Sequence, residues 1–454
     1  MKCDSSLVIP ISFQTLLQSV MCLKGYEPNP SNRKVGKSST GIPFKCDDSN
    51  EDGGMSKETS QMQVNGCRNN FPATTSDRSN LWEIHGRYYD ISENFVKVHP
   101  GGSHAILLGK GRDCTALFES YHPFTKQHTR RVLAKYEVVS PLLDCDRCDY
   151  KNDRNVRPSE DTVTDEFYDM LKQRVEKHLR ENHIDPIRDR CATLSRLLYY
   201  SLILCCTIYT GFLHCQGFVI KGSFLFGIFG WLTGSLGHDG GHFSVHRNPI
   251  VNKVCTNGMF LLCNPIMWQY QHTYAHHSHT NDFDKDPDLH HFTVFLRYHK
   301  KMIFDRIYKR QESVLYIILT YTFVTFGECI KIPWGALCQN SIYGIIELEQ
   351  ESCKQKFSMF VHIALYIYIV FIVPWMTTSS LALGSLCAIV HMVTTGLHFA
   401  FFSQINHINE DSILAAGSEE RREDGYPQRD KAKDTWAITQ VKTSNNFAPD
   451  SYFW

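Results

Sequence analysis

Long apolar runs constrain this chain more than any other feature. Two of them, at about 195–214 and 217–236, are separated by a few residues around Gln216, and two more, at about 357–376 and 379–402, repeat the arrangement. Each run approaches the roughly 20 residues that a helix needs to cross a bilayer. Because the link within each pair is short, we expect two helical hairpins and a multi-pass membrane protein.

A fifth run, Val314–Ile332, is shorter and contains Glu328 and Lys331. The histidine-rich segments near 238, 272 and 407 can share one membrane face only if an even number of crossings separates them. We therefore expect the fifth run to lie at the membrane interface rather than to span. The segment RYHKKMIFDRIYKR just before it has the basic excess that is typical of a cytosolic face. The prediction is four spans, with the chemistry on the cytosolic side.

The rest of the chain divides by composition. Residues 1–80 are rich in Ser, Asn, Gly, Lys and Asp, which predicts a disordered leader. Residues 81–140 have the mixed pattern of a small folded domain, and residues 141–190 form a charged linker before the membrane part, 191–454. Apolar residues near helical spacing predict an amphipathic helix in the linker: Phe167, Met170, Leu171, Val175 and Leu179.

Charge and the N-terminus exclude some function classes. The 47 basic residues balance 47 acidic ones, so there is no electrostatic reason to expect a nucleic acid partner. The first 24 residues contain Asp4 and several polar residues, without the basic, apolar and small-residue progression of a signal peptide. We therefore expect membrane insertion to depend on the internal runs.

Two histidines in the small domain suggest a haem site. His99 stands in HPGG and His122 in SYHP. A bis-histidine haem needs two imidazoles on opposite faces of the porphyrin, each supplied from a separate loop or helix. Pro100, Gly101 and Gly102 favour a tight turn that can present the first imidazole. Apolar residues that could line the pocket are Ile106, Leu107, Leu108, Leu117 and Phe118.

Around these histidines, the Trp82 region, the YYD at 88–90, HPGG and GRDCTALF resemble a cytochrome b5 domain. The resemblance implies a small α+β fold that binds haem b, with His99 and His122 as the axial ligands. It also implies that two other histidines are bystanders, His104 and His128. The alternative for His99 is an ordinary turn residue.

Histidines cluster again just after the second apolar run, in HDGGH and HTYAHH. Histidines four apart on a helix share a face, which suits two ligands of one metal. Neutral imidazole commonly binds iron or zinc, and such clusters at a membrane boundary are costly to place without a function. Two boxes at helix ends therefore predict a metal centre.

HDGGH, WQYQHTYAHHSHTND and the DPD at 286–288 resemble the membrane fatty-acid desaturases, specifically the front-end type with a fused N-terminal cytochrome b5. The resemblance runs from about Leu81 to Trp454. It implies an all-α multi-span membrane domain of about four helices after the haem domain, and two non-haem iron ions that use oxygen to introduce a double bond into a fatty acyl chain. Breaking an unactivated C–H bond requires such a metal. The positions that match the family's ligands are His238, His242, His272, His276 and His277.

The same resemblance implies partners and a location. Electrons would pass from a cytochrome b5 reductase through the haem to the iron, and the fused haem domain would supply them at high local concentration. The substrate would be a fatty acyl lipid or an acyl-CoA. We expect an endoplasmic reticulum membrane, with the haem domain and the histidine boxes facing the cytosol.

The C-terminal stretch departs from the family pattern, which has a final QxxHH box. QINHI at 404–408 has one histidine where a full box has two. We take His407 as a further metal ligand, and we expect the domain to be C-terminally incomplete and the chain by itself to show little desaturation. Four other histidines are expected to be structural or interfacial: His290, His291, His391 and His398.

Three alternatives remain open at this point. A lipid hydroxylase also uses histidine boxes, and a sphingolipid desaturase shares them. The third alternative is a membrane-anchored haem electron carrier with an inactive desaturase part, because the last box differs. Product analysis separates the first two from a fatty-acid desaturase, and the iron content separates the third.

Overall fold

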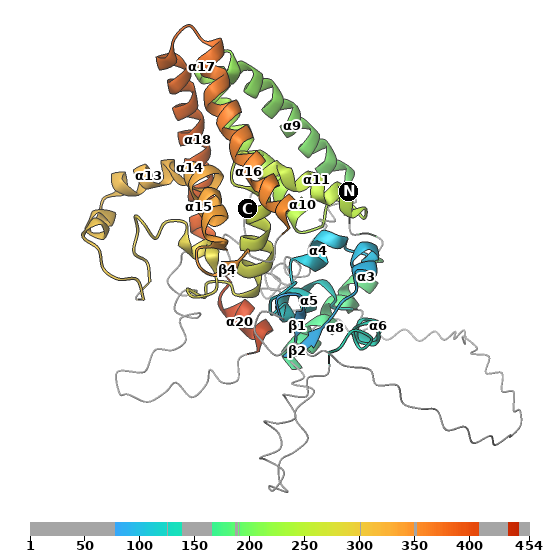
Figure 1. Ribbon diagram of the computed structural model, residues 1–454. Coiled ribbons are helices and arrows are strands. Elements are labelled where there is room, and N and C mark those ends of the chain that lie inside the picture. The colour runs from blue at the N-terminus through green and yellow to red at the C-terminus, as the bar shows by residue number, and fades with distance from the viewer. Residues whose placement is uncertain are drawn as a thin grey trace, which may run out of the picture.

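The computed structural model describes residues 78–124, 126–138, 166–186, 189, 191–299, 301–348, 352–407 and 435–444. The predicted leader lies outside these residues up to position 77. Within the described ranges, a small mixed domain lies against one end of a bundle of long helices (Figure 1). The α+β class predicted for the first part and the helical class predicted for the second are both confirmed.

The small domain combines a β-hairpin with short helices. Strands β1 (Trp82–Ile84) and β2 (Arg87–Tyr89) pair antiparallel, and His85 and Gly86 between them both have positive φ, as a tight hairpin turn requires. The helices that follow are α3 (Glu93–Val98), α4 (Ser103–Leu107), α5 (Thr115–Tyr121) and α6 (Lys126–Leu133). The hairpin and helices enclose a core of Trp82, Ile84, Tyr89, Ile91, Val96 and Cys114.

Two helical hairpins form the long bundle, as predicted. The first consists of α9 (Leu194–Cys215), η2 (Val219–Phe224) and α10 (Leu225–Gly241). The second consists of α16 (Cys353–Ile367), η8 (Tyr368–Ile372), α17 (Val373–Thr377) and α18 (Leu381–His407). Both hairpins turn at the end far from the haem domain, where the Thr377 hydroxyl donates to the Cys215 carbonyl.

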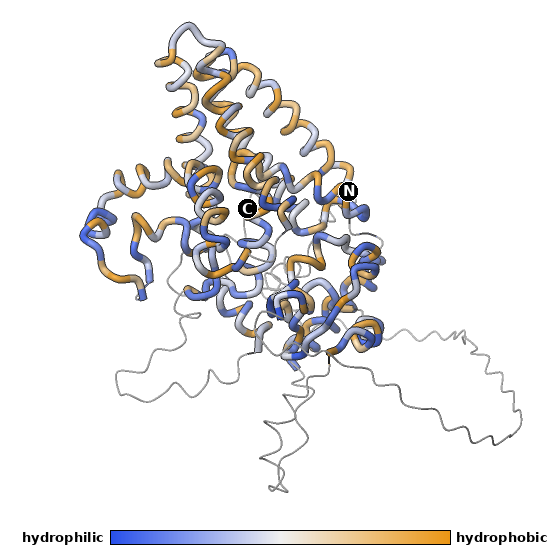
Figure 2. The backbone as a smooth tube through the Cα atoms, viewed as in Figure 1, coloured by the Kyte–Doolittle hydropathy of each residue, from blue (hydrophilic) through white to orange (hydrophobic). Residues whose placement is uncertain are grey.

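The outer surface of this bundle is apolar. On α9, Leu202 is 65% exposed and Ile208 is 72% exposed, which suits contact with lipid rather than water. Figure 2 shows hydrophobic residues along the long helices, and hydrophilic residues in the haem domain and the neighbouring loops. The bundle is therefore the membrane-embedded part of the protein.

The fifth apolar run bends instead of crossing. It forms α13 (Val314–Thr322), α14 (Val324–Phe326), η7 (Gly327–Lys331) and α15 (Ile332–Gln339). Length and composition alone make this run a fifth candidate span. However, α13 lies across the direction of the hairpin helices, and the run begins and ends toward the haem-domain end of the bundle (Figure 1). This geometry agrees with four crossings.

Glycines on α10 allow the backbone of the following segment to pack closely against the end of this helix. A Cβ atom at Gly237 would lie 2.3 Å from the backbone nitrogen of Met259, and one at Gly240 would lie 2.6 Å from that of Thr256. The backbone of η3 (Thr256–Met259) therefore packs directly on α10. This close approach brings the second histidine box back to the first.

The elements near the histidine boxes are short. They are α11 (Pro249–Cys255), α12 (Pro265–Trp268), η4 (Gln269–His276), η5 (Pro287–His290), η6 (Arg306–Glu312), and the small hairpin of β3 (Ser341–Ile342) and β4 (Ile346–Glu347). η4 follows α12 directly, without a break. The second box therefore lies on a continuous helical segment rather than on a loop.

The predicted linker helix is α8 (Glu166–Glu181). Leu171, Val175 and Leu179 are buried as expected, whereas Met170 is 41% exposed. The buried face packs against Ala437 of α20 (Trp436–Lys442). α8 thus joins the C-terminal part of the chain to the haem domain, where the hydroxyl of Tyr168 donates to the carbonyl of Glu119.

Candidate haem and metal sites

The two histidines predicted as haem ligands face each other. His99 follows α3 and His122 follows α5, and their ring centroids are 6.2 Å apart. An imidazole bound to iron on each side at about 2 Å would place the ring centroids roughly 6 Å apart. The Nδ1 atom of His122 is 2.9 Å from the Phe118 carbonyl, and that of His99 is 3.4 Å from the Gly102 carbonyl. Both rings therefore present Nε2 to a shared metal, which fits a bis-histidine haem.

Side chains around the pair only partly follow the predicted lining. The Phe118 ring stacks on His122 with centroids 4.7 Å apart. Ile106, Leu107 and Leu117 are partly buried against the core of the small domain. Leu108 is fully buried in a different cluster, which includes residues of the helical domain. Its side chain contributes to the contact between the domains.

Four histidines from the two boxes converge at the end of α10. His238 lies on α10 and His242 follows it, while His272 lies on η4 and His277 follows it. The Nε2 atom of His277 is 3.1 Å from the Nε2 atoms of both His242 and His272. One ligand atom from each of the four histidines lies within 4.8 Å of the others. Two nitrogens bound to one ion at about 2.1 Å come roughly this close, so the donor set fits a metal.

Electrostatics favour the ligand form of these imidazoles. Burial, followed by the neighbouring imidazoles, holds the pKa of His242 and of His277 well below the usual value. Burial likewise lowers the pKa of His272 to about 4. Because a metal binds the neutral ring, the site does not have to release protons from these three histidines first.

The helix geometry of the second box differs from the expectation. The sequence argument placed His272 and His276 on one face of an α-helix, four residues apart. η4 is a π-helix, whose hydrogen bonds join residues five apart. This wider turn brings His272 and His277 to the four-histidine group, and directs His276 elsewhere.

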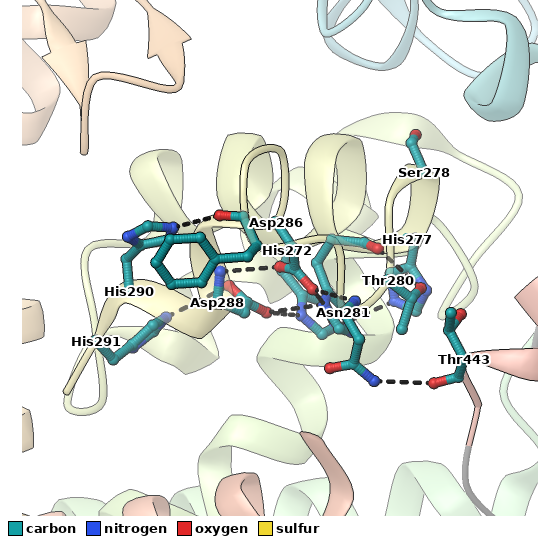
Figure 3. Close-up of polar contacts among 12 residues, drawn as sticks. His272, His277, Ser278, Thr280, Asn281, Asp286, Asp288, His290, His291 and Thr443 are labelled. Carbon is teal, nitrogen blue, oxygen red and sulfur yellow. Dashed lines mark hydrogen bonds and ion pairs between the residues drawn. The ribbon is translucent and has the colours of Figure 1, made fainter. Parts of the chain in front are cut away.

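His276 lies instead in a second group with His272 and Asp288. The Nδ1 atom of His276 is 2.8 Å from Asp286, and that of His272 is 2.9 Å from Asp288 (Figure 3). Burial alone would lower the pKa of His276, but the two carboxylates outweigh it and raise the pKa to about 9. The carboxylates fix the orientation and tautomer of rings that can bind metal through Nε2.

His291 extends this network away from the boxes. Its Nδ1 atom is 2.9 Å from Glu328, and its Nε2 atom is 3.4 Å from Asp288. Despite its burial, these carboxylates raise the pKa of His291 to about 10. Glu328 lies in the fifth apolar run and is 1% exposed. In the sequence, a carboxylate within an apolar run could have indicated that Glu328 has a buried partner, because an unpaired charge is costly in such a run.

The C-terminal helix braces the loop that carries Asp286. The backbone N–H of Asn281 donates to the carboxylate of Asp286 over 2.7 Å. The side-chain amide of Asn281 donates to the carbonyl of Thr443 over 2.9 Å (Figure 3). The hydroxyl of Thr280 donates to Gln440 on α20. No sequence signal indicated this contact.

The remaining histidines occupy other positions. His290 donates to the carbonyl of Phe283, His398 donates to that of Thr394, and His391 is buried against Phe226, which suits structural roles. His128 lies on the exposed side of α6. His407 is the last residue of α18, and its side chain lies outside the described residues. Its role as a ligand stays a prediction.

Two family models match the chain. The model of the fatty acid desaturases matches residues 217–454, and that of the cytochrome b5-like haem/steroid binding domain matches residues 70–139. No solved structure matches the chain. The two models cover the metal site and the haem site, respectively.

Relatives match across both domains. The chain is 30% identical to an acyl-lipid (8-3)-desaturase of Mortierella alpina, over 82% of this chain and 79% of the relative. It is 28% identical to acyl-lipid (8-3)-desaturase B of Dictyostelium discoideum, over 83% and 78%. It is 27% identical to an acyl-lipid omega-13 desaturase of Chlamydomonas reinhardtii, over 84% and 82%.

These findings confirm the predicted enzyme class and cofactors. The function is fatty acid desaturation rather than that of a haem carrier alone, and the cofactors are haem and a di-iron centre. The apolar helices agree with a multi-pass membrane protein. The chain belongs to the fatty acid desaturase family, and it has the fused N-terminal cytochrome b5 domain of the front-end type.

Proposed function

We propose that this enzyme inserts a double bond into an acyl chain carried on a membrane lipid, at an iron centre held by the histidine boxes. The ligands in this proposal are His238, His242, His272, His276, His277 and His407. The observation that carries it is the convergence of four imidazoles at the end of α10. Haem held by the histidine pair of the small domain would relay the electrons.

Bound iron would activate oxygen and allow two hydrogens to be removed from an unactivated chain. The protein's own residues hold and orient this chemistry. Asp288 and Asp286 accept the Nδ1 protons of His272 and His276, so that the Nε2 atoms stay available to metal. The Trp268 ring stacks on His272 with centroids 4.7 Å apart, which restricts rotation of that ligand.

A lipid-linked substrate is supported by position and by the relatives. The first histidine box lies at the end of the candidate span Val219–Gly241, where we expect the acyl chains of a bilayer to meet their headgroups. Several relatives are named acyl-lipid desaturases. An acyl-CoA is the competing substrate.

The electron donor and membrane are also part of the proposal. A cytochrome b5 reductase is the expected source of electrons for a haem domain of this kind. The basic residues of η6, Lys309 and Arg310, directly precede the fifth run. This charge favours a cytosolic orientation in the endoplasmic reticulum.

The test is production of the full chain in a yeast host that is fed polyunsaturated fatty acids. We expect a new double bond to appear first in the phospholipid fraction after a short pulse of labelled fatty acid, at a low level because QINHI at 404–408 has one histidine where the family's last box has two. Earlier appearance in the acyl-CoA fraction would contradict the lipid-linked substrate. A hydroxylated product, or no product from a chain that is present in the membrane, would contradict the proposed chemistry.

A further inference from the structure

A tyrosine of the haem domain reaches a residue of the first histidine box. The hydroxyl oxygen of Tyr121 is 3.3 Å from the Nδ1 atom of His242. Tyr121 ends α5, and the next residue is the haem ligand His122. The ring of Tyr121 also packs edge-on against Phe243, with centroids 5.8 Å apart. Tyr121 therefore connects the helix of a haem ligand to a residue of the first histidine box.

The Tyr121 hydroxyl can orient His242 as a metal ligand without binding the metal itself. An imidazole that binds metal through Nε2 carries its proton on Nδ1, and that proton needs an acceptor. Carboxylates of Asp288 and Asp286 serve His272 and His276 in this way. For His242, the group that faces Nδ1 is the tyrosine hydroxyl of the haem domain.

Other contacts hold the two domains in this position. Gly102 has φ +90°, and a Cβ atom there would lie 2.5 Å from the Cβ atom of Pro249, so a side chain would push the domains apart. The hydroxyl of Tyr274 donates to the carbonyl of Asp113 over 3.1 Å. The turn that presents the first haem ligand therefore packs directly against the metal-binding domain.

We propose that Tyr121 is a positioning residue that completes the iron centre from the haem domain. Its hydroxyl accepts the Nδ1 proton of His242, and its covalent link to His122 provides a route for electrons from the haem ligand to an iron ligand. The inference rests on the proposed function, because it takes His242 as an iron ligand.

Electrons would move one at a time from the haem to the histidine centre. In each transfer, the haem held by His99 and His122 would give up one electron and go from ferrous to ferric, and one iron held by the histidine boxes would take up this electron and go from ferric to ferrous. Two transfers provide the two electrons that one double bond requires with one oxygen molecule. The flavoprotein reductase, or dithionite in the experiment below, reduces the haem again.

The test compares Tyr121→Phe with Tyr274→Phe in the purified full chain. Both substitutions remove one hydroxyl from the contact between the domains, but the Tyr274 hydroxyl faces a backbone carbonyl rather than a ligand. One readout is the rate at which a ferrous chelator removes non-haem iron. The other is the anaerobic rate at which haem, reduced by one electron equivalent from dithionite, is oxidised by the ferric centre.

We expect Tyr121→Phe to accelerate iron loss and to slow haem oxidation, each by about tenfold or more, with an unchanged haem spectrum and midpoint potential. Tyr274→Phe should behave as the wild type. Wild-type rates in Tyr121→Phe, equal changes in both variants, or loss of haem from Tyr121→Phe would each overturn the inference. If the wild-type chain holds haem but no non-haem iron, the proposed function fails first.

Discussion

The haem pair and the four-histidine centre use the same ligand but obtain their support differently. At the haem, the Nδ1 atoms of His99 and His122 face backbone carbonyls three and four residues away. At the metal centre, the Nδ1 atom of His272 faces a side chain 16 residues away, and that of His242 faces one 121 residues away. The haem site is therefore supported by its own short segment, whereas the iron site depends on the tertiary structure. Substitutions at distant positions should damage the second site and spare the first.

The largest expected effect tests the ligand set itself. His277→Ala should abolish product and remove non-haem iron, because the Nε2 atom of His277 lies between those of two other ligands. Haem absorbance should remain. The measurement is metal analysis with product analysis, and His279→Ala is the control, since His279 lies outside both groups among the described residues. Retention of iron and product in His277→Ala would remove it from the ligand set.

The reverse experiment removes the haem alone. His122→Ala should lose the haem absorbance and the product, while most of the non-haem iron remains and a separately supplied cytochrome b5 restores part of the product. His128→Ala, on the exposed side of α6, is the matched control. If non-haem iron disappears together with haem, the two sites are not supported separately and the comparison fails.

A smaller effect is expected from a residue that supports a ligand. Asp288→Asn replaces the carboxylate that accepts from His272, so turnover or iron affinity should fall by about 10- to 100-fold. Asp284→Asn provides the control, because this exposed carboxylate pairs with Lys301, which follows η5, and is not bonded to a histidine of the boxes in the described residues. Chelator-release rates and turnover measure both variants. Equal behaviour of the two would show that Asp288 does not orient the ligand.

The smallest effect concerns the haem domain. The indole N–H of Trp82 donates to the carbonyl of Ile106 over 2.7 Å. Trp82→Phe should lower the free energy of unfolding of this domain by about 1–3 kcal/mol, since one partly buried hydrogen bond is lost and the smaller ring fills less of the core. Urea unfolding followed by the haem band measures the loss, and chelator release should not change. A change in iron release would show that the domain's stability also controls the metal centre.

The same contrast explains what the sequence could predict. The four spans followed from run lengths and parity, and the haem ligands from two motifs whose supporting groups are local. Both His276 and His277 were expected as ligands, but the π-helical turn that places His277, rather than His276, beside His238 and His242 is set by packing, which a four-residue spacing rule does not contain. Glu328 was noted as an obstacle to spanning, but its pairing with His291 required the folded chain. Nothing in the sequence connected Tyr121 with His242.

We infer that one chain holds a haem and a histidine-bound iron centre side by side. Total iron per haem in the detergent-purified full chain tests it most directly, with haem measured by absorbance and iron by metal analysis. We predict a ratio of about three, one iron in the haem and two in the histidine centre. A ratio near one, in protein whose haem spectrum is intact, would contradict it.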